Sequence, residues 1–281
     1  MQTLVKSATK THAITTEGRF TIIGEAINPT GRKRLAQALY EHDLDYVRSL
    51  ARNQAAAGAD LIDVNVGVPD LDEVTLLAEA VEAVAADVDL PLCIDTASPR
   101  ALEAALAVAP GRPLVNSVTG ERASLESVLP LVKEYDVPVI GLTMDDDGIP
   151  DDPESRLAIA ERIINRAAQV GIPAADVLID PLVLTVGADP DAASVTLRTV
   201  ELVRQHFGAN INLGATNVSF GLPERDTLNR AFLALGIRAG ATSAITNPAT
   251  LGLTIRGTEL LLGRDEFAAG YIGLYRQQQN A

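Results

Sequence analysis

The sequence is poor in the residues that build covalent or metal-centred scaffolds. Of its 281 residues one is cysteine, three are histidine and none is tryptophan. A single cysteine, Cys93, excludes an internal disulfide framework and a cysteine-based zinc or iron–sulfur cluster within one chain. Because Cys93 stands in the apolar run Pro-Leu-Cys-Ile, we interpret it as a small apolar filler.

Positive charge is also scarce. Lys and Arg number 23 against 37 Asp and Glu, which gives a formal net charge of −14. Binding to nucleic acid or to an anionic membrane surface needs clustered Lys and Arg, so neither is an expected partner. No stretch approaches the ~20 apolar residues of a membrane span, and the N-terminal segment lacks the apolar run of a secretory signal. We therefore expect a cytoplasmic protein.

What the sequence does contain is a repeated alternation of short apolar runs and longer segments of helical periodicity. The runs are nearly continuously apolar, which is typical of parallel strands covered on both faces. Eight such units in about 250 residues predict a single (β/α)8 TIM barrel of the α/β class. A doubly wound sheet is the alternative, but the first run is not followed by G-x-G-x-x-G. The predicted strands are 21–27, 61–67, 92–97, 114–119, 137–144, 177–184, 211–218 and 243–247.

Several helix boundaries are also marked. Ser98-Pro99, Asp152-Pro153 and Asp189-Pro190 are typical of helix starts, and Gly171 and Gly208 of helix ends. No linker or run of charged residues divides the chain into separate domains. We expect residues 20–281 to form one barrel domain and the Thr-, Ser- and Lys-rich residues 1–19 to be a flexible N-terminal extension.

The predicted strand ends carry carboxylates and carboxamides but no His, Lys or Arg. Catalytic groups of a barrel come from these ends, so a Schiff-base lysine, a histidine-ligated zinc hydrolase and a Ser–His–Asp hydrolase are all disfavoured. Asp or Asn after a strand also serves as a turn former or helix N-cap. The strand-end residues are Glu25, Asn28, Asp63, Asn65, Asp95, Asn116, Ser117, Thr143, Asp145, Asp180, Thr216, Asn217, Thr246 and Asn247.

Acids and amides without cations suit a flat, neutral ligand that presents several N–H donors. A pterin fits this description, because its exocyclic NH2 and a ring N–H lie side by side and one carboxylate can accept both. Asp95, Asn116, Asp180 and Asn217 each follow an apolar run and are the strongest candidates for such contacts.

At these residues the sequence resembles the pterin-binding methyltransferases, and most of all the methyltetrahydrofolate:corrinoid/iron–sulfur protein methyltransferases. The likeness runs from about residue 21 to residue 268. It is carried by IGEAIN at 23–28, DVNVG at 63–67, LCID at 92–95, NS at 116–117, IGLTM at 140–144, GIP at 148–150, IDPL at 179–182 and TNVS at 216–219.

The resemblance implies a role for particular residues. It implies that Asp95, Asn116 and Asp180 hold the pterin and that Asn217 is the catalytic group that reaches N5 of the folate. Arg225 lies in the loop after the seventh strand, where it would meet the anionic folate tail or the partner. Phe220 and Ala26 depart from the family member compared, which has glutamine and arginine there. The remaining residues expected to bind substrate are Asp63, Asn65, Gly141, Met144 and Ser219, and no metal site is expected.

The implied activity is one-carbon transfer between N5 of methyltetrahydrofolate and the cobalt of a corrinoid such as cobalamin. The chain has no Asp-x-His-x-x-Gly loop to supply a lower histidine to cobalt. The corrinoid would therefore come on a separate protein that docks at the C-terminal barrel face. The resemblance also implies a homodimer, and the direction of transfer stays open.

Three alternatives remain. A dihydropteroate synthase shares the barrel and the pterin pocket, but it needs a lysine on strand seven and an arginine on strand eight, and those segments contain no cation. A metal-dependent lyase would use carboxylates to hold Mg²⁺. A non-catalytic folate-binding or scaffold protein would bind folate without methyl transfer. The carboxylates available to a lyase are Glu25, Asp63, Asp95 and Asp180.

Overall fold

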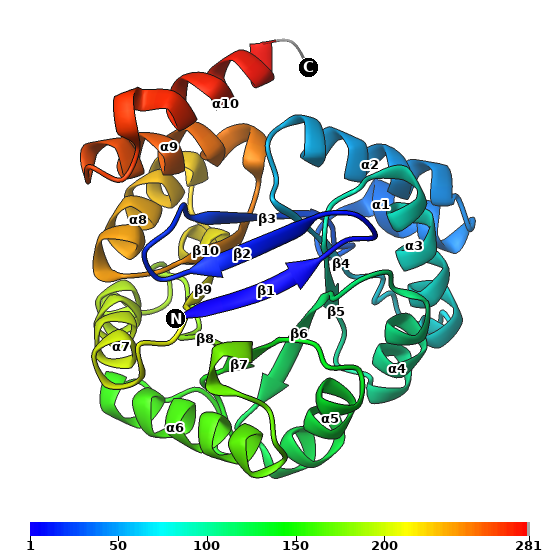
Figure 1. Ribbon diagram of the computed structural model, residues 1–281, viewed down its shortest axis with the longest axis horizontal. Helices are drawn as coiled ribbons and strands as arrows, with labels where there is room; N and C mark the ends of the chain where they lie inside the picture. Colours follow the sequence, from blue (N-terminus) through cyan, green and yellow to red (C-terminus); the bar gives the residue numbers. More distant parts are fainter. Residues whose placement is uncertain (280–281) are drawn as a thin grey trace.

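The computed structural model describes residues 1–279 and has eight parallel strands arranged as a barrel surrounded by helices (Figure 1). Neighbouring strands pair in the order β8-β7-β6-β5-β4-β3-β10-β9, and a parallel bridge between Ile179 and Ile211 links the two ends of this series. The predicted (β/α)8 fold is confirmed. The strands are β3 Thr21–Ile27, β4 Leu61–Val64, β5 Leu92–Asp95, β6 Leu114–Thr119, β7 Val139–Leu142, β8 Val177–Asp180, β9 Asn212–Gly214 and β10 Ser243–Thr246.

Two layers of apolar side chains hold the barrel together. The outer layer lies between strands and helices, and the inner layer fills the barrel with about one side chain per strand. Burial on both faces explains why the strand sequences are continuously apolar instead of alternating. Cys93 is fully buried in the inner layer, which confirms its interpretation as an apolar filler. The other inner-layer residues contributed by the strands are Ile23, Leu61, Leu114, Ile140 and Leu178.

The helices alternate with the strands, and two of the predicted helix starts have the expected N-cap hydrogen bond. The side chain of Ser98 accepts from the N–H of Ala101, and that of Asp152 accepts from the N–H of Ser155. One predicted start is displaced, because Asp189 forms a local turn with the N–H of Asp191. The helices are α1 Lys33–Tyr40, α2 Leu44–Ala56, α3 Glu73–Asp87, α4 Pro99–Val108, α5 Arg122–Glu134, α6 Pro153–Gln169, α7 Ala192–Phe207, α8 Arg225–Ala239, α9 Pro248–Leu261 and α10 Ala269–Gln279.

The expectation that residues 1–19 are a flexible extension is wrong. Strands β1 (Gln2–Lys6) and β2 (Thr11–Thr15) form an antiparallel hairpin that lies across one end of the barrel (Figure 1). Its inward side chains Val5 and Ile14 are fully buried and complete the inner apolar layer. The hairpin therefore closes the end of the barrel at which the strands begin.

Polar contacts fix this hairpin to the loops that precede the strands. The carboxamide of Asn210 donates to the hydroxyl of Thr3 at 3.0 Å and to the carbonyl of Ile14 at 2.9 Å. Burial alternates along β1, and β2 buries Ile14 alone, so the apolar residues that face inward are isolated and the segment resembles a polar tail in sequence.

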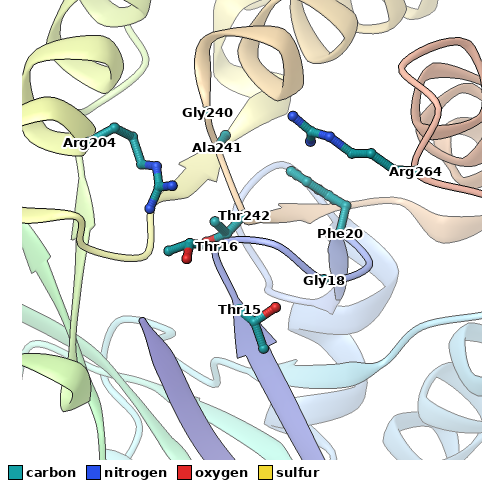
Figure 2. Close-up of a pocket in the computed structure, with 9 residues that line it drawn as sticks. All are labelled: Thr15, Thr16, Gly18, Phe20, Arg204, Gly240, Ala241, Thr242 and Arg264. Carbon is teal, nitrogen blue, oxygen red and sulfur yellow. The ribbon is translucent and has the colours of Figure 1, made fainter.

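Beside the hairpin lies a small cavity of about 60 Å³, shown in Figure 2. It is bounded by the end of β2, the start of β10 and the side chains of Arg204 and Arg264. Phe20 and Thr242 in its wall directly precede β3 and β10, so the cavity lies away from the strand ends that carry the predicted site. Within residues 1–279, no helix is both long and apolar enough to cross a membrane.

Candidate active site

The large cavity of the molecule lies at the carboxyl ends of the barrel strands and has a volume of about 820 Å³. Its wall includes residues of all eight barrel strands and of the loops that follow them. This is the position at which barrel enzymes place their catalytic groups. Six of the residues predicted from the sequence line this one cavity: Asp63, Asp95, Asn116, Asp180, Asn217 and Arg225.

Two carboxylates on neighbouring strands form one part of the wall, each held by an asparagine. Nδ2 of Asn65 donates to Asp95 at 3.0 Å, and Nδ2 of Asn116 donates to Asp63 at 3.3 Å. Asp95 and Asn116 are direct partners in the pairing of β5 with β6. Sheet register therefore brings together residues that lie far apart in the sequence.

Burial changes the acidity of this pair. It raises the pKa of Asp63 well above the usual range, and the nearby charge of Asp95 raises it further. Burial also raises the pKa of Asp95 to about 6, partly offset by the hydrogen bond from Asn65. Both carboxyl groups of this pair therefore hold a proton more readily than an exposed aspartate does, and Asp63 holds it the more strongly.

A third carboxylate, Asp180, lies at the end of β8 and is 5% exposed. It accepts from the N–H of Leu182 and from Nδ2 of Asn212, both at 2.9 Å. Burial raises its pKa to about 6, and these hydrogen bonds oppose the shift. A carboxylate has about four acceptor sites, so two remain for a ligand.

Two residues that support Asp180 were missed in the sequence. Asn212 lies inside β9, where its carboxamide is fully buried between Asp180 and Ser243. Arg156 of α6 is 1% exposed and donates to the carbonyls of Pro181 and Leu182 at 2.7 and 2.8 Å. A polar residue in an apolar run was the available signal for Asn212, whereas Arg156 looks like an ordinary helix-surface residue.

The turn that carries Asn217 is a short 3-10 helix, η2 (Ala215–Ser219). Asn217 lies against Gly214, where a Cβ atom would come within 3.0 Å of its Nδ2. Arg225 donates to the carbonyl of Thr216 at 2.7 Å and to the hydroxyl of Ser219 at 3.0 Å. The absent side chain at Gly214 leaves room for the Asn217 carboxamide, and Arg225 holds the turn that carries it at the cavity mouth.

Glu25 connects this turn to the first barrel strand. Its carboxylate accepts from the hydroxyl of Thr216 at 3.0 Å and lies 3.6 Å from the guanidinium of Arg32. Burial raises the pKa of Glu25 above its usual value. Arg32 also lines the cavity, but its place in the loop before α1 gave no sequence signal for such a contact.

Four other predicted substrate-binding residues lie outside the cavity lining. Asn65 bonds to Asp95, and Ser219 donates to Oδ1 of Asn229 at 2.7 Å. A Cβ at Gly141 would come within 2.9 Å of Ile163 on α6, so this glycine serves strand–helix packing. The carbonyl of Met144 accepts from the N–H of Gly120 at 2.8 Å. Within the IGLTM segment, Leu142 lines the cavity, whereas Gly141 and Met144 support the barrel behind it. The four residues are Asn65, Gly141, Met144 and Ser219.

The acidic side chains are spread around the mouth instead of converging on one point. Across residues 1–279, no three His, Cys, Asp or Glu side chains are grouped so that they could hold a metal ion.

Comparison with known proteins places this arrangement in a family. The sequence model of the pterin binding enzyme family matches residues 24–247, which is more than half of the chain. The chain belongs to the pterin-binding enzyme family. Within that family it is 31% identical over 264 residues to a methylcorrinoid:tetrahydrofolate methyltransferase of Eubacterium limosum, covering 91% of this chain and 96% of that protein. It is 30% identical over 239 residues to methionine synthase of Mycobacterium tuberculosis, covering 80% of this chain but 20% of that protein.

Solved structures of other pterin-binding enzymes share the fold. A Yersinia pestis dihydropteroate synthase with a pterin–sulfa conjugate superposes with a TM-score of 0.72 at 19% identity, over 92% of this chain and 98% of that chain. A Clostridium difficile dihydropteroate synthase with pteroic acid gives a TM-score of 0.68 at 21% identity, over 87% and 97% of the two chains. At this level of identity the likeness shows the barrel fold alone.

Proposed function

We propose that this pterin-binding enzyme transfers a methyl group between N5 of methyltetrahydrofolate and the cobalt of a corrinoid carried by a separate protein. One observation carries the proposal. Buried carboxylates at the ends of strands far apart in the sequence and the carboxamide of Asn217, in the turn after β9, line a single cavity. The similarity to the Eubacterium limosum methyltransferase over 96% of that protein supports it.

The acidic side chains provide the pterin-binding part of the site. Asp180 keeps two acceptor sites after its contacts with Leu182 and Asn212. In our proposal it accepts the pterin NH2 and a ring N–H, and Asp95 and Asn116 bind the remaining polar edge. Because Asp180 and Asp95 are largely removed from water, hydrogen bonds to them are stronger than at an exposed surface.

Asn217 is the group that acts on the reacting nitrogen. In transfer to cobalt, Co(I) supplies the electron pair of the new Co–C bond while the N5–CH3 bond breaks. N5 keeps the electron pair of the broken bond and takes up a proton, and the reverse transfer retraces these changes. A hydrogen bond from Nδ2 of Asn217 to N5 strengthens as charge develops there. Its exposed position at the mouth suits the approach of a bulky metal complex.

The approach of the corrinoid protein follows from the shape of the barrel. The N-terminal hairpin closes the opposite end with Val5 and Ile14, so the reacting nitrogen is reachable only from the mouth. We therefore propose docking over the C-terminal barrel face. The homodimer and the cytoplasmic location expected from the sequence belong to the same proposal and are testable by light scattering and by cell fractionation.

The dihydropteroate synthase alternative is not favoured by the strand ends. Directly at the ends of β9 and β10 the cavity is lined by Thr216, Asn217 and Asn247, and the cation that follows β9, Arg225, lies at the start of α8 and not on a strand. That chemistry expels pyrophosphate and requires lysine and arginine on these strands. The barrel is shared with dihydropteroate synthases, whereas the cations needed for their reaction are replaced by neutral side chains.

The test is a methyl-transfer assay with the purified chain. Under anaerobic conditions, 5-methyltetrahydrofolate and cob(I)alamin should give methylcobalamin, seen as a change in the visible spectrum. Asn217→Ala should abolish most of this rate, and Asn53→Ala on the outer surface of α2 is the matched control. Folate binding without transfer in either direction would indicate a non-catalytic binding protein. Loss of activity with a chelator would favour the metal-dependent lyase.

A further inference from the structure

Two arginines line the small cavity beside the N-terminal hairpin, in a chain whose formal net charge is −14 (Figure 2). Arg204 comes from the last turn of α7, and Arg264 follows the end of α9. Figure 2 shows both side chains extending inward from opposite sides, toward the segment that contains Ala241 and Thr242. Positive charge is therefore gathered at the end of the barrel that lies away from the candidate active site.

Arg204 is held in place by the loop between α7 and β9. Its Nη1 donates to the carbonyls of Gly208 and Ala209 at 3.1 and 3.0 Å. Its aliphatic stem lies against Gly240, where a Cβ atom would come within 2.9 Å of Cγ of Arg204. Among residues 1–279 these bonds engage Nη1 alone, so Nε and Nη2 keep their N–H groups for a ligand in the cavity.

The two guanidinium groups are poorly compensated by negative charge. Neither Arg204 nor Arg264 forms an ion pair with Asp or Glu within the described residues 1–279. Burial lowers the pKa of Arg204, the charge of Glu17 opposes this shift, and the charge of Arg264 adds to it. Glu17 is exposed in the loop after β2, so water screens its charge. An anion between the two arginines would relieve their mutual repulsion.

The volume of the cavity limits the ligand to a small group. One ordered water takes up about 10–15 Å³ of such a volume. A cavity of about 60 Å³ therefore has room for about four to six non-hydrogen atoms, which matches a phosphate or sulfate ion. The hydroxyls of Thr15 and Thr16 lie in the same wall and can donate to the oxygens of such an ion. Gly18 and Arg264 are exposed, so the cavity is reachable from solvent.

We propose that Arg204 and Arg264 form a binding site for a tetrahedral oxyanion, which is either free phosphate or the terminal phosphate of a phosphomonoester. Guanidinium groups suit phosphate oxygens because their N–H groups form a fixed fork. The anion bridges α7, the segment after α9 and the end of β2. Because the unfolded chain lacks this arrangement, the bound anion stabilises the closed end of the barrel. The site is separate from the pterin cavity, so the proposal does not depend on the proposed function.

The experiment measures the thermal midpoint of the folate-free protein against inorganic phosphate, with sodium chloride adjusted to hold ionic strength constant. The wild-type midpoint should rise with phosphate in a saturable way that gives the Kd. Arg204→Gln and Arg264→Gln should each weaken phosphate binding roughly 10- to 100-fold. Glu17→Gln should tighten it about two- to threefold, because a negative charge near Arg204 is removed. Arg100→Gln, at an exposed position of α4 outside the cavity, is the matched control and should behave as the wild type.

Methyl phosphate distinguishes the two sources of the anion. Binding at least as tight as that of inorganic phosphate supports a phosphomonoester, and weaker binding supports the free ion. The proposal is overturned if phosphate has no saturable effect on the wild type, or if either Arg204→Gln or Arg264→Gln keeps the full effect. It is also overturned if the effect is lost in Arg225→Gln instead, which would place the anion at the barrel mouth. Each variant is compared with and without phosphate, so a change in its own stability does not imitate lost binding.

Discussion

Replacing Asp180 with asparagine removes an acceptor while keeping the size of the side chain. Asp180 already accepts two hydrogen bonds, at 2.9 Å each, from Leu182 and Asn212. The carboxylate keeps two further acceptor sites for the pterin, whereas a carboxamide has one oxygen and an NH2 group that opposes the ligand's donors. A hydrogen bond to a charged group contributes about 1.5–3 kcal/mol. Loss of one such bond, with one donor facing another, should cost about 3 kcal/mol, roughly 100-fold in Kd.

The assay is calorimetric titration of Asp180→Asn with 5,6-dimethyltetrahydropterin, a pterin that lacks the aminobenzoyl-glutamate tail of folate. Asp147→Asn, an exposed carboxylate in the loop after β7, is the matched control and should bind normally. Thermal melting of both variants separates loss of binding from loss of the fold. An Asp180→Asn protein that melts normally and binds within threefold of the wild type would refute the assignment of Asp180 to the pterin edge.

Further predictions concern catalysis, pH and stability. Asn217→Ala should lower kcat by raising the activation barrier about 2.7–4 kcal/mol, with a smaller change in the Kd for folate. A loss of folate affinity as large as the loss of kcat would argue against transition-state stabilisation. Burial raises the pKa of Asp95 and Asp180 to about 6, so pterin affinity should fall as pH drops from 7 to 5. The same two groups bind more protons in the folded than in the unfolded protein between pH 6 and 4, so their contribution to the stability of the ligand-free protein should rise as pH falls through this range. A pterin affinity that stays constant from pH 7 to pH 5 would contradict the need for ionised carboxylates. Ile14→Ala should lower the free energy of unfolding by about 2–5 kcal/mol, measured by thermal or denaturant melts. Leu4→Ala is the control, because Leu4 is partly exposed and its loss should change the stability little. Equal effects of the two substitutions would contradict the role of the hairpin in closing the end of the barrel at which the strands begin.

Much of the barrel could be predicted because a parallel strand buried on both faces leaves a strong local signal. The runs at 21–27 and 114–119 coincide with the observed strands β3 and β6, although the pairing is irregular between Gly24 and Ile27 and between Asn116 and Val118. The hairpin was missed for the opposite reason. Val5 and Ile14 become core residues only through contacts with distant strands. The residues next to them in the sequence form no apolar pattern that predicts their burial.

The site was predictable in part for the same physical reason. Asp95 and Asp180 end apolar strands, so a polar side chain is visible there in sequence. Asn212 and Arg156 act through neighbours that only the folded chain brings near. Gly141 belongs to a matching segment, but its missing side chain serves packing against Ile163 instead of the cavity.

The most direct measurement is a crystal structure of the protein with 5-methyltetrahydrofolate bound. We expect the pterin edge within hydrogen-bonding distance of Asp95, Asn116 and Asp180, with N5 facing Nδ2 of Asn217 and its methyl group directed toward the open mouth. A pterin bound elsewhere, or these carboxylates coordinating an ion in its place, would contradict the account.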